Sequence, residues 1–372
     1  MKKKQVKKLK TTLLLGLAVI PVFCIGIMKT ESPTVKTVAP QVLETAFETE
    51  ILQQLEHVAL GEPAQETQPV YEIKDLTGPA PTPNPASSGE LQSPEELKKL
   101  LQKAEAVLEG QKLYLTPETE LFPGSTVHYY LDDSIFAVAW KQRVENTAFT
   151  FAEVKIMHPS QFRRHLSGEE FGSGMLSLTS EMTKSVNAVL GCSGDYYSYR
   201  RRGLTIVEGE AKKYVKGLPD TCYINSQGDL ILERDQDLED LAAVQAYADE
   251  NDIQFSLSFG PILVKDGENV CPGYYDLGEV KQQYSRAAIC QMDKLHYLYI
   301  AAGTDVGAYS LMTMKTFSTH VAATGCQQAY ALDGGQTTTI VLNDKVINNV
   351  NYGSERRISD IVYFATAIGE GA

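Results

Sequence analysis

The sequence predicts an α+β fold, with mixed β-sheets and flanking helices, preceded by an N-terminal membrane anchor and a partly helical stalk. From residue 112 onward, short runs of β-branched and aromatic residues are separated by turn residues, and these runs outnumber the helical patterns. The helical patterns interrupt the runs irregularly, whereas a parallel α/β fold alternates strand and helix. A basic segment, an apolar segment and a proline-rich stretch precede residue 112, so we assign the globular domain to residues 112–372.

The first 28 residues have the composition of a signal segment or a membrane anchor. Residues 1–10 contain six lysines and no acid, and residues 11–28 are mainly apolar. No small-x-small cleavage site follows, and Phe23 before Cys24 is too large for a lipoprotein signal. We therefore expect a basic cytoplasmic segment, an uncleaved single-pass helix in the cell membrane and an extracytoplasmic C-terminal domain. Secretion after signal cleavage stays open as the alternative, because the apolar segment is short and contains Pro21.

Residues 29–111 are interpreted as a stalk or linker with helices. Prolines cluster between residues 69 and 85 and are followed by Ser87, Ser88 and Gly89, a composition typical of an extended linker. An apolar periodicity predicts a helix at 42–59. A second helix is expected to begin at Ser93, as an N-cap before proline and two acids, and to end at Gly110. We expect both helices to act as a spacer or an oligomerising segment, and the oligomeric state is left open.

The domain of residues 112–372 divides into short predicted elements. Strands are predicted at 127–130, 135–141, 148–157, 204–207, 221–225, 230–232, 255–264, 287–291, 297–301, 340–342 and 361–364. Helices are predicted at 179–189, 238–251 and 311–324. No internal repeat accompanies this order, which favours one α+β domain.

Charge, cysteine and histidine content restrict the partners. Beyond residue 28, 28 basic side chains stand against 47 acidic ones, which argues against a nucleic-acid-binding protein. The five cysteines outside the anchor show no Cys-x-x-Cys spacing, so we interpret them mainly as small buried residues, with one disulfide left open. The six histidines form no metal-like cluster in sequence. We predict neither a metal nor a cofactor.

The run 329–343 is the most informative stretch for function. An apolar segment is followed by one carboxylate, Asp333, and then by two glycines. A row of hydroxyl side chains and a β-branched strand come after the glycines. Glycines let backbone amides approach an anionic or polyhydroxyl ligand closely, and hydroxyls add donors without charge. The alternative is a tight β-turn with an Asx-type hydrogen bond, which is common where Asp-Gly joins two strands.

Several blocks, in this order, resemble the phosphodiester glycosidase family, and the chain is similar to a divergent bacterial surface member of it. The blocks are 179–197 with its Gly-Asp-Tyr-Tyr, 203–209, 220–225, 258–267 with Ser-Phe-Gly-Pro, 284–290, 332–335 with Leu-Asp-Gly-Gly, and 355–362. Together they span about residues 125–366. An isolated Asp-Gly-Gly is a weak signal, but an ordered series is a specific one.

The resemblance implies a site for a sugar joined through its anomeric carbon to a phosphodiester. Arg286 would clamp the phosphate, since a guanidinium can pair with two of its oxygens; the alternative for Arg286 is a structural salt bridge. Asp333 would be the carboxylate at the anomeric centre, and Asp195 the second carboxylate or a buried turn-capping residue. The residues expected to bind the substrate are Ser193, Gly194, Tyr196, Gly334, Gly335, Thr337 and Thr338. Arg200, Arg201 and Arg202 would attract phosphate at the rim or form a solvated turn.

The resemblance therefore implies an extracytoplasmic hydrolase of a sugar-1-phosphodiester linkage in a cell-envelope or exopolysaccharide glycopolymer. The chain departs from the family pattern at Ser193 (asparagine), Ala287 (threonine), Cys290 (glycine) and Gln336 (glycine), and an Asp-Gly-Arg run appears as Ala-Gly-Thr at 302–304. Loss of several polar groups would weaken transition-state stabilisation. The alternative function is thus a catalytically impaired member that binds a glycopolymer or assists envelope assembly.

Overall fold

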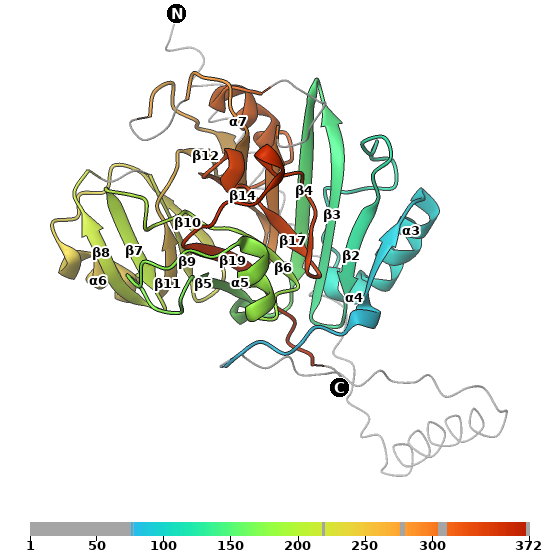
Figure 1. Ribbon diagram of the computed structural model, residues 1–372, viewed down its shortest axis with the longest axis horizontal. Helices are drawn as coiled ribbons and strands as arrows, with labels where there is room; N and C mark the ends of the chain where they lie inside the picture. Colours follow the sequence, from blue (N-terminus) through green and yellow to red (C-terminus); the bar gives the residue numbers. More distant parts are fainter. Residues whose placement is uncertain (1–75, 77, 218–219, 276–279, 304–310, 370–372) are drawn as a thin grey trace, which may run out of the picture. The chain divides into compact units, whose positions relative to one another are not determined.

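The computed structural model describes residues 76, 78–217, 220–275, 280–303 and 311–369 (Figure 1). The chain divides into two units, Met1–Val70 and Tyr71–Ala372. The predicted basic segment, the anchor and the helix at 42–59 lie outside the described residues. Within the described ranges, no helix has both the length and the hydropathy needed to cross a membrane.

The largest sheet of the described residues has nine strands, and every pairing between them is antiparallel. In spatial order they are β1 (Ser88–Leu91), β2 (Val127–Leu131), β3 (Ile135–Val144), β4 (Thr147–Ile156), β15 (His296–Ala302), β14 (Arg286–Asp293), β16 (Gln328–Leu332), β12 (Ile262–Lys265) and β13 (Glu268–Asn269). The strand that precedes Asp333, β16, therefore lies inside this sheet, between β14 and β12.

Three smaller antiparallel sheets complete the described part. The five-stranded sheet has the order β18 (Lys345–Val346), β17 (Ile340–Leu342), β6 (Leu190–Ser193), β19 (Asp360–Phe364) and β5 (Phe162–Leu166). The three-stranded sheet contains β10 (Leu230–Glu233), β9 (Thr221–Asn225) and β11 (Ile253–Leu257), and the two-stranded one contains β7 (Gly203–Val207) and β8 (Glu210–Val215). Antiparallel sheets with few helices confirm the α+β prediction for this part of the chain.

The nine-stranded sheet is buried on both faces because its strands alternate between two cores. On β14, Ala287 and Ile289 join the core shared with the five-stranded sheet. Ala288 and Cys290 point into a second core on the opposite face. That second core is covered by α3 (Pro94–Lys103), α4 (Glu105–Leu108) and α7 (Met314–Ala322).

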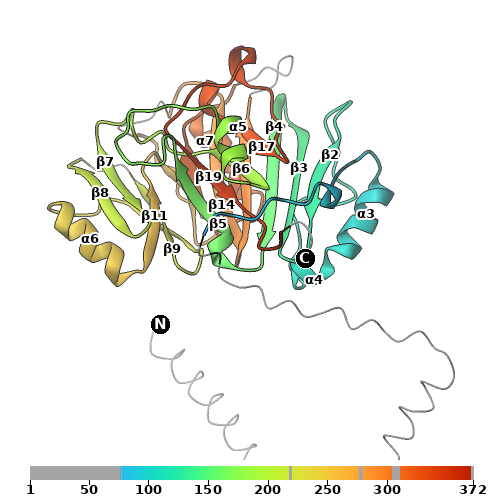
Figure 2. The same cartoon turned by 60° about the horizontal axis from the view of Figure 1, so that its bottom comes forward.

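The remaining helices cover the smaller sheets. Helix α5 (Thr179–Ser185) packs on β6 and β19, as Figure 2 shows, and buries Met182 with Ile361 and Tyr363. Helix α6 (Leu241–Glu250) begins at Asp240, whose carboxylate accepts from the Ala243 amide at 2.9 Å, and it packs against β8 and β11. Four short 3₁₀ turns are η1 (Pro85–Ser87), η2 (Pro159–Gln161), η3 (Gly335–Thr337) and η4 (Asn351–Gly353).

The segment 88–108 belongs to the folded unit, which corrects its assignment to the stalk. The predicted helix start is confirmed, because Ser93 and Glu96 form a reciprocal capping box. However, β1 pairs with β2 of the nine-stranded sheet, and Leu97 and Leu100 are buried in the core beneath it. Proline-rich composition did not distinguish a solvated linker from a strap that packs on a sheet.

The predicted strand 255–264 is two strands in different sheets, β11 and β12. Between them, Gly260 has a φ of +78° and Pro261 offers no N–H to a ladder. The pattern also missed β5, β8 and β16. The first two are rich in charged residues, Phe162-Arg-Arg-His-Leu166 and Glu210-Ala-Lys-Lys-Tyr-Val215, which hide their alternation.

Shortening the side chain of Leu100 tests whether the segment 88–108 is part of the core. Leu100→Ala should reduce the free energy of unfolding by about 2–5 kcal/mol, since it removes a buried side chain and leaves a cavity. Lys98→Ala on the exposed side of the same helix should change it by less than about 0.5 kcal/mol. Denaturant titration of the two variants measures both values, and equal effects would contradict the corrected boundary.

Candidate functional site

Two loops that leave adjacent sheets form the candidate site. The first follows β6 at Ser193, and the second follows β16 at Leu332. Ser193 ties them together, because its amide donates to the Thr339 carbonyl at 3.1 Å and its Oγ accepts from the Thr339 amide at 3.3 Å. Ser193 also lies 3.2 Å from the Tyr299 hydroxyl and is fully buried. Ser193 therefore holds the two loops together and is not exposed to a ligand.

A cavity of about 750 Å³ lies over these loops. Its lining contains one carboxylate, three aromatic rings, one serine and four arginines: Asp333, Tyr196, Tyr199, Phe259, Ser198, Arg200, Arg201, Arg202 and Arg356. Of the predicted site residues, the structure therefore brings Asp333 and Tyr196 together. The arginines predicted only as a rim or a solvated turn are part of the same lining.

Asp333 is half-buried and directly follows β16 of the nine-stranded sheet. The Thr337 hydroxyl donates to its Oδ2 at 2.9 Å, and the Thr338 hydroxyl donates to its carbonyl oxygen at 3.2 Å. Burial raises the pKa of Asp333, while the Thr337 hydrogen bond and the positive charges of Arg200 and Arg356 act in the opposite direction. Of the predicted threonines, Thr337 thus holds the carboxylate and Thr338 holds the backbone of Asp333, and neither lines the cavity.

The two glycines after Asp333 are required by the backbone. A Cβ on Gly334 would lie 2.2 Å from the Ser285 carbonyl oxygen, a distance that only a shift of backbone could relieve. Gly335 has a φ of +66°, in the region that favours glycine. This is the tight-turn interpretation of the Asp-Gly-Gly motif, and here the turn places Asp333 at the cavity.

Arg200 and Arg356 approach the cavity from different loops. The Arg200 guanidinium lies 3.7 Å from the centroid of the Phe259 ring, and its Nε donates to the Asp195 carbonyl at 3.1 Å. Arg356 lies 5.1 Å from the centroid of Tyr196. Aromatic faces orient a guanidinium without neutralising its charge. Arg356 belongs to the Glu-Arg-Arg block at 355–357, which sequence comparison marked without assigning it a role.

Asp195 lies in a buried ion network, which does not suit the predicted role of second catalytic carboxylate. Arg164 contacts Asp195 at 2.7 Å and Asp360 at 2.8 Å, and all three side chains are nearly inaccessible to solvent. The Ser258 amide donates to the other Asp195 oxygen at 2.7 Å. Both oxygens are thus occupied, so the alternative of a buried structural residue describes Asp195 better.

Asp360 connects this network to the cavity wall. Its carboxylate accepts from the Tyr196 amide at 2.9 Å, and a Cβ on Gly194 would lie 2.1 Å from its Oδ2. Burial raises the pKa of Asp360 to about 6, and the charge of Asp195 acts in the same direction. Gly194 is therefore needed for close packing, and the network positions Tyr196.

Arg286, the predicted phosphate clamp, is not among the residues that line this cavity. Its guanidinium is buried and donates to two backbone carbonyls, those of Gln282 at 2.7 Å and Met312 at 3.2 Å. A clamp must present its donors to the ligand, whereas these two donors hold the segments that precede β14 and α7. The cations that share the cavity with Asp333 come from two other loops.

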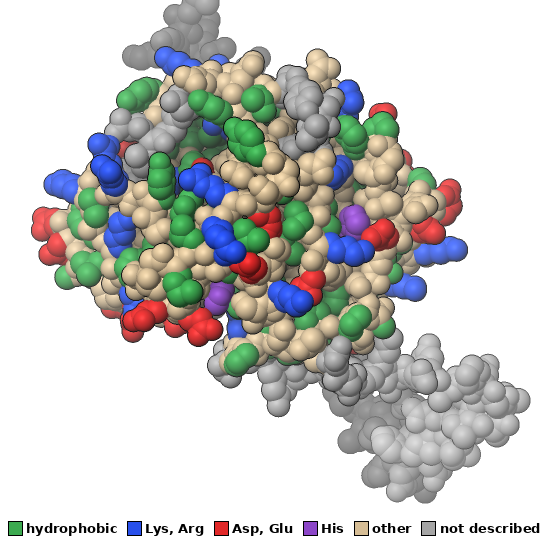
Figure 3. All heavy atoms as spheres, in the orientation of Figure 1, with side chains coloured by type: hydrophobic (Ala, Val, Ile, Leu, Met, Phe, Trp, Pro, Cys, Tyr) green, Lys and Arg blue, Asp and Glu red, His purple; other side chains and the backbone are tan. Residues whose placement is uncertain are grey.

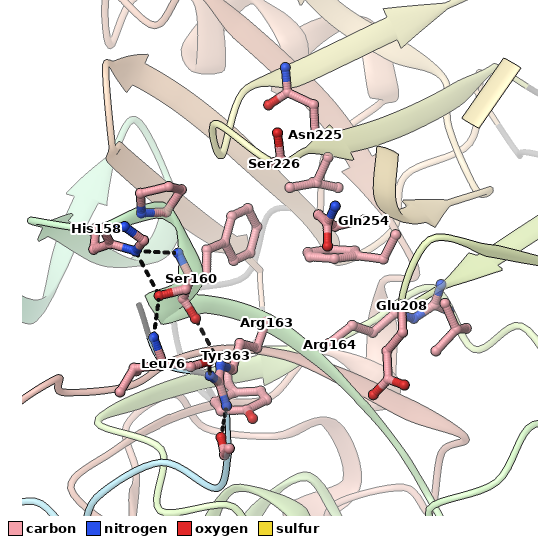
Figure 4. A pocket seen from close by; sticks show the side chains of 16 residues that line it. Leu76, His158, Ser160, Arg163, Arg164, Glu208, Asn225, Ser226, Gln254 and Tyr363 are labelled. Atoms are coloured by element: carbon pink, nitrogen blue, oxygen red, sulfur yellow. Dashed lines mark hydrogen bonds between the residues drawn. The ribbon is translucent and has the colours of Figure 1, made fainter. Parts of the chain in front are cut away.

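A second cavity of about 610 Å³ lies between β5, β9 and β11 (Figure 4). Its Arg163 donates to the carbonyls of Leu76 and Gly78, and its Arg164 belongs to the buried ion network. Besides these arginines, its lining contains the carboxylate of Glu208. This cavity is therefore poorly suited to an anionic ligand.

The described residues offer no group of three His, Cys, Asp or Glu side chains placed to hold a metal ion. The five cysteines in these ranges are free, and all but Cys271 are buried.

The two carboxylates should respond oppositely to substitution. Asp195→Asn should cost about 3–5 kcal/mol of unfolding free energy, because it breaks a buried ion pair. Asp333→Asn should not reduce stability at pH 7. Because burial raises the pKa of Asp333 in the folded state, the ionised carboxylate destabilises the fold as pH rises through that pKa. Asparagine carries no charge and therefore removes this destabilisation at pH 7. Denaturant titrations at pH 7 compare the two; a large loss in Asp333→Asn would contradict this assignment.

Comparison with known proteins gives one family. Residues 186–365 match the model of the family described as phosphodiester glycosidase. No curated protein matches the sequence. Among solved structures, the chain is similar to the catalytic domain of zebrafish N-acetylglucosamine-1-phosphodiester alpha-N-acetylglucosaminidase, auto-inhibited by its pro-peptide, at 15% identity and a TM-score of 0.49, covering 70% of this chain and 92% of that one.

A hypothetical protein from Synechocystis shows 14% identity and a TM-score of 0.45, over 63% of this chain and 62% of that one. At such identities and scores, neither structure informs the chemistry of the cavity. The family match covers the loops of Tyr196, Arg200, Asp333 and Arg356.

Proposed function

We propose that this protein hydrolyses a sugar-1-phosphodiester at the cavity of Asp333, because residues 186–365 match the model of the phosphodiester glycosidase family. The observation that carries the proposal is the placement of one partly buried carboxylate in a lining with four arginines and three aromatic rings. Guanidinium groups bind phosphate, a carboxylate assists reaction at an anomeric carbon, and aromatic faces stack on sugars.

The chemistry of the leaving group accounts for a single carboxylate in the lining. Most glycosidases use two, one of them as an acid that protonates the leaving oxygen. A phosphomonoester has a second pKa of about 6. It therefore leaves as an anion when cations neutralise it, and Arg200 and Arg356 are placed for that task beside Asp333.

Asp333 then serves the other half of the reaction. Water attacks the anomeric carbon, the bond from that carbon to the bridging oxygen breaks, and its electron pair leaves with the phosphate. The proton of the attacking water passes to Asp333. The Thr337 hydrogen bond and the nearby arginines keep this half-buried carboxylate ionised more readily than burial alone would allow.

We further propose that the substrate is part of a cell-envelope or exopolysaccharide glycopolymer, and that the domain acts outside the cytoplasm on a membrane anchor. Support comes from the lysine-rich segment followed by an apolar one at the N-terminus. Secretion after cleavage of that segment is the alternative.

Removal of the carboxylate tests the reaction. Asp333→Asn should lower kcat for sugar release from a sugar-1-phosphodiester by about 10²–10⁴-fold, the range expected for a lost acid–base group. Asp344 is an exposed aspartate in the turn between β17 and β18, outside the cavity lining, so Asp344→Asn is the matched control and should keep wild-type turnover. Sugar release is measured with a reducing-sugar assay, and undiminished turnover in Asp333→Asn would remove this residue from the mechanism.

One observation favours the second candidate function, glycopolymer binding without turnover. Ala287 and Ala302, two positions where the family pattern has polar groups, are buried among apolar side chains and offer no polar contact. If this second function holds, the wild-type protein would retain the glycopolymer through the cavity arginines and release no sugar after long incubation, whereas a hydrolase would release it.

The neighbouring arginines 356 and 357 provide a matched pair for the phosphate contact. Arg356→Gln should lower kcat/KM about tenfold or more, the factor expected for one lost hydrogen bond to a charged group. Arg357 forms an exposed ion pair with Glu181 at 2.9 Å, and Arg357→Gln should change kcat/KM less than twofold. Steady-state kinetics of both variants give the comparison; equal effects would deny Arg356 a part in binding phosphate.

A further inference from the structure

We infer that Gln336 is a positioning residue, which fixes the loop of Arg356 and thereby holds this guanidinium at the cavity of Asp333. The inference rests on the proposed function, because it takes Arg356 to contact the phosphate of the substrate. It deepens that function, since it assigns the spacing between the carboxylate and the cation to a single turn, η3.

The guanidinium of Arg356 is not held by polar contacts of its own. Within the described ranges it forms neither a hydrogen bond nor an ion pair, and the residue is exposed. Its Cζ lies 5.1 Å from the ring centroid of Tyr196 and 5.8 Å from that of Tyr199. Because cation–π contacts at exposed sites are weak, the position of Arg356 depends on the backbone of its loop.

Gln336 fixes that backbone just before Arg356. Its Nε2 donates to the Ser354 carbonyl at 3.1 Å and to the Ser354 hydroxyl at 3.4 Å. Gln336 is half-buried in η3, whereas Ser354 is exposed, so this side chain joins the turn after Asp333 to a loop that is otherwise open to solvent. Loss of the donor would therefore release the loop two residues before Arg356.

The same loop is fixed to the region of α5 on both sides of Arg356. Before it, the Glu355 carboxylate accepts from the Ser180 hydroxyl at 2.6 Å and from the Ser180 amide at 3.3 Å. After it, Ile358 and Ser177 exchange two backbone hydrogen bonds at 2.9 Å and 3.0 Å. The loop thus has anchors on α5 and on η3, and only the anchor on η3 connects it to the turn that holds the carboxylate.

Two neighbouring side chains of η3 hold the two charged groups of the proposed reaction. Thr337 donates to the Asp333 carboxylate at 2.9 Å, and Gln336 beside it holds the loop of Arg356. On the face of the domain drawn in Figure 3, Lys and Arg side chains are interspersed with Asp and Glu side chains, so a cation near a carboxylate is common there. A shared anchor is what distinguishes this pair, and catalysis requires charged groups that are held in place before the substrate binds.

Binding of a phosphate probe tests the inference without turnover. Gln336→Met approximately keeps the length of the side chain and removes its donor. In the full chain, this variant should raise the dissociation constant of dimethyl phosphate, measured by NMR titration, about threefold or more, the factor expected for one lost hydrogen bond. Gln328 donates to the Asp266 carboxylate at 2.8 Å, outside the cavity lining, so Gln328→Met is the matched control and should keep the wild-type dissociation constant.

A second background distinguishes positioning of Arg356 from a general loss of stability. In Arg356→Gln, the further change Gln336→Met should alter the dissociation constant less than about 1.5-fold, because Gln336 acts on the phosphate only through Arg356. Without ligand, hydrogen exchange of the amides at 353–357 should be faster in Gln336→Met and unchanged in Gln328→Met. Ser180→Ala removes the hydroxyl anchor on Glu355 and should have a smaller effect of the same kind. It covers the case in which Gln336→Met does not fold, as judged by its melting temperature.

The inference is overturned by an unchanged dissociation constant or exchange rate in Gln336→Met, by an equal loss of binding in both backgrounds, or by a wild type that does not bind the probe. Sugar release is measured separately. A protein that shows the expected pattern and releases no sugar would refute the proposed hydrolysis and keep the role of Gln336. A protein that releases sugar, with Gln336→Met as active as wild type, would do the reverse.

Discussion

The buried ion network of Arg164, Asp195 and Asp360 is the constraint on which the candidate site depends. A charged group without solvent is costly unless it is paired and hydrogen-bonded. Here the Arg164 guanidinium forms ion pairs with both carboxylates. The remaining carboxylate oxygens accept hydrogen bonds from the backbone amides of Tyr196 and Ser258. These bonds join the loop after β6 to β5, β19 and the end of β11. The network therefore determines where the cavity wall lies, although it supplies no reacting group.

Two similar carboxylates thus have opposite tasks, set by their surroundings. Asp195 is fully buried and paired with a cation, so it stabilises the loop. Asp333 is half-buried, is held by a threonine hydroxyl and faces a cavity lined with arginines. A single reactive carboxylate is sufficient if the leaving group is a phosphate, because the arginines replace the acid that an ordinary glycoside requires. A phosphate leaving group would thus explain both the arginines and the single carboxylate in the lining.

Much of the fold could be predicted from the sequence. Alternation and turn residues located strands such as β3, β9 and β17, and the Ser93 capping signal located α3. The segment 88–108 was assigned to the stalk and not to the folded unit, because its packing on the nine-stranded sheet depends on residues far along the chain. The strands β5 and β8 were missed because their charged side chains hide the alternation of buried and exposed positions.

The site was predicted less well than the fold. The Asp-Gly-Gly turn led to Asp333, and the resemblance marked the blocks that contain Tyr196, Phe259 and Arg356, which share the cavity lining with it. Exposure could not be predicted: the sequence does not show that Arg286 is buried on backbone carbonyls or that Asp195 is enclosed by Arg164. Arg356 lay in a marked block, yet only its approach to Tyr196 and the cavity distinguishes it from Arg357.

The position of bond cleavage tests the central claim most directly, because the roles of Asp333 and the arginines require water to attack the anomeric carbon. The measurement is hydrolysis of a sugar-1-phosphodiester in ¹⁸O-labelled water, followed by phosphorus NMR of the phosphomonoester and mass spectrometry of the sugar. The account predicts that the label enters the sugar and that the phosphate carries none. Label in the phosphate would mean attack at phosphorus, and would contradict the assignment of Asp333 and of the arginine-stabilised phosphate leaving group.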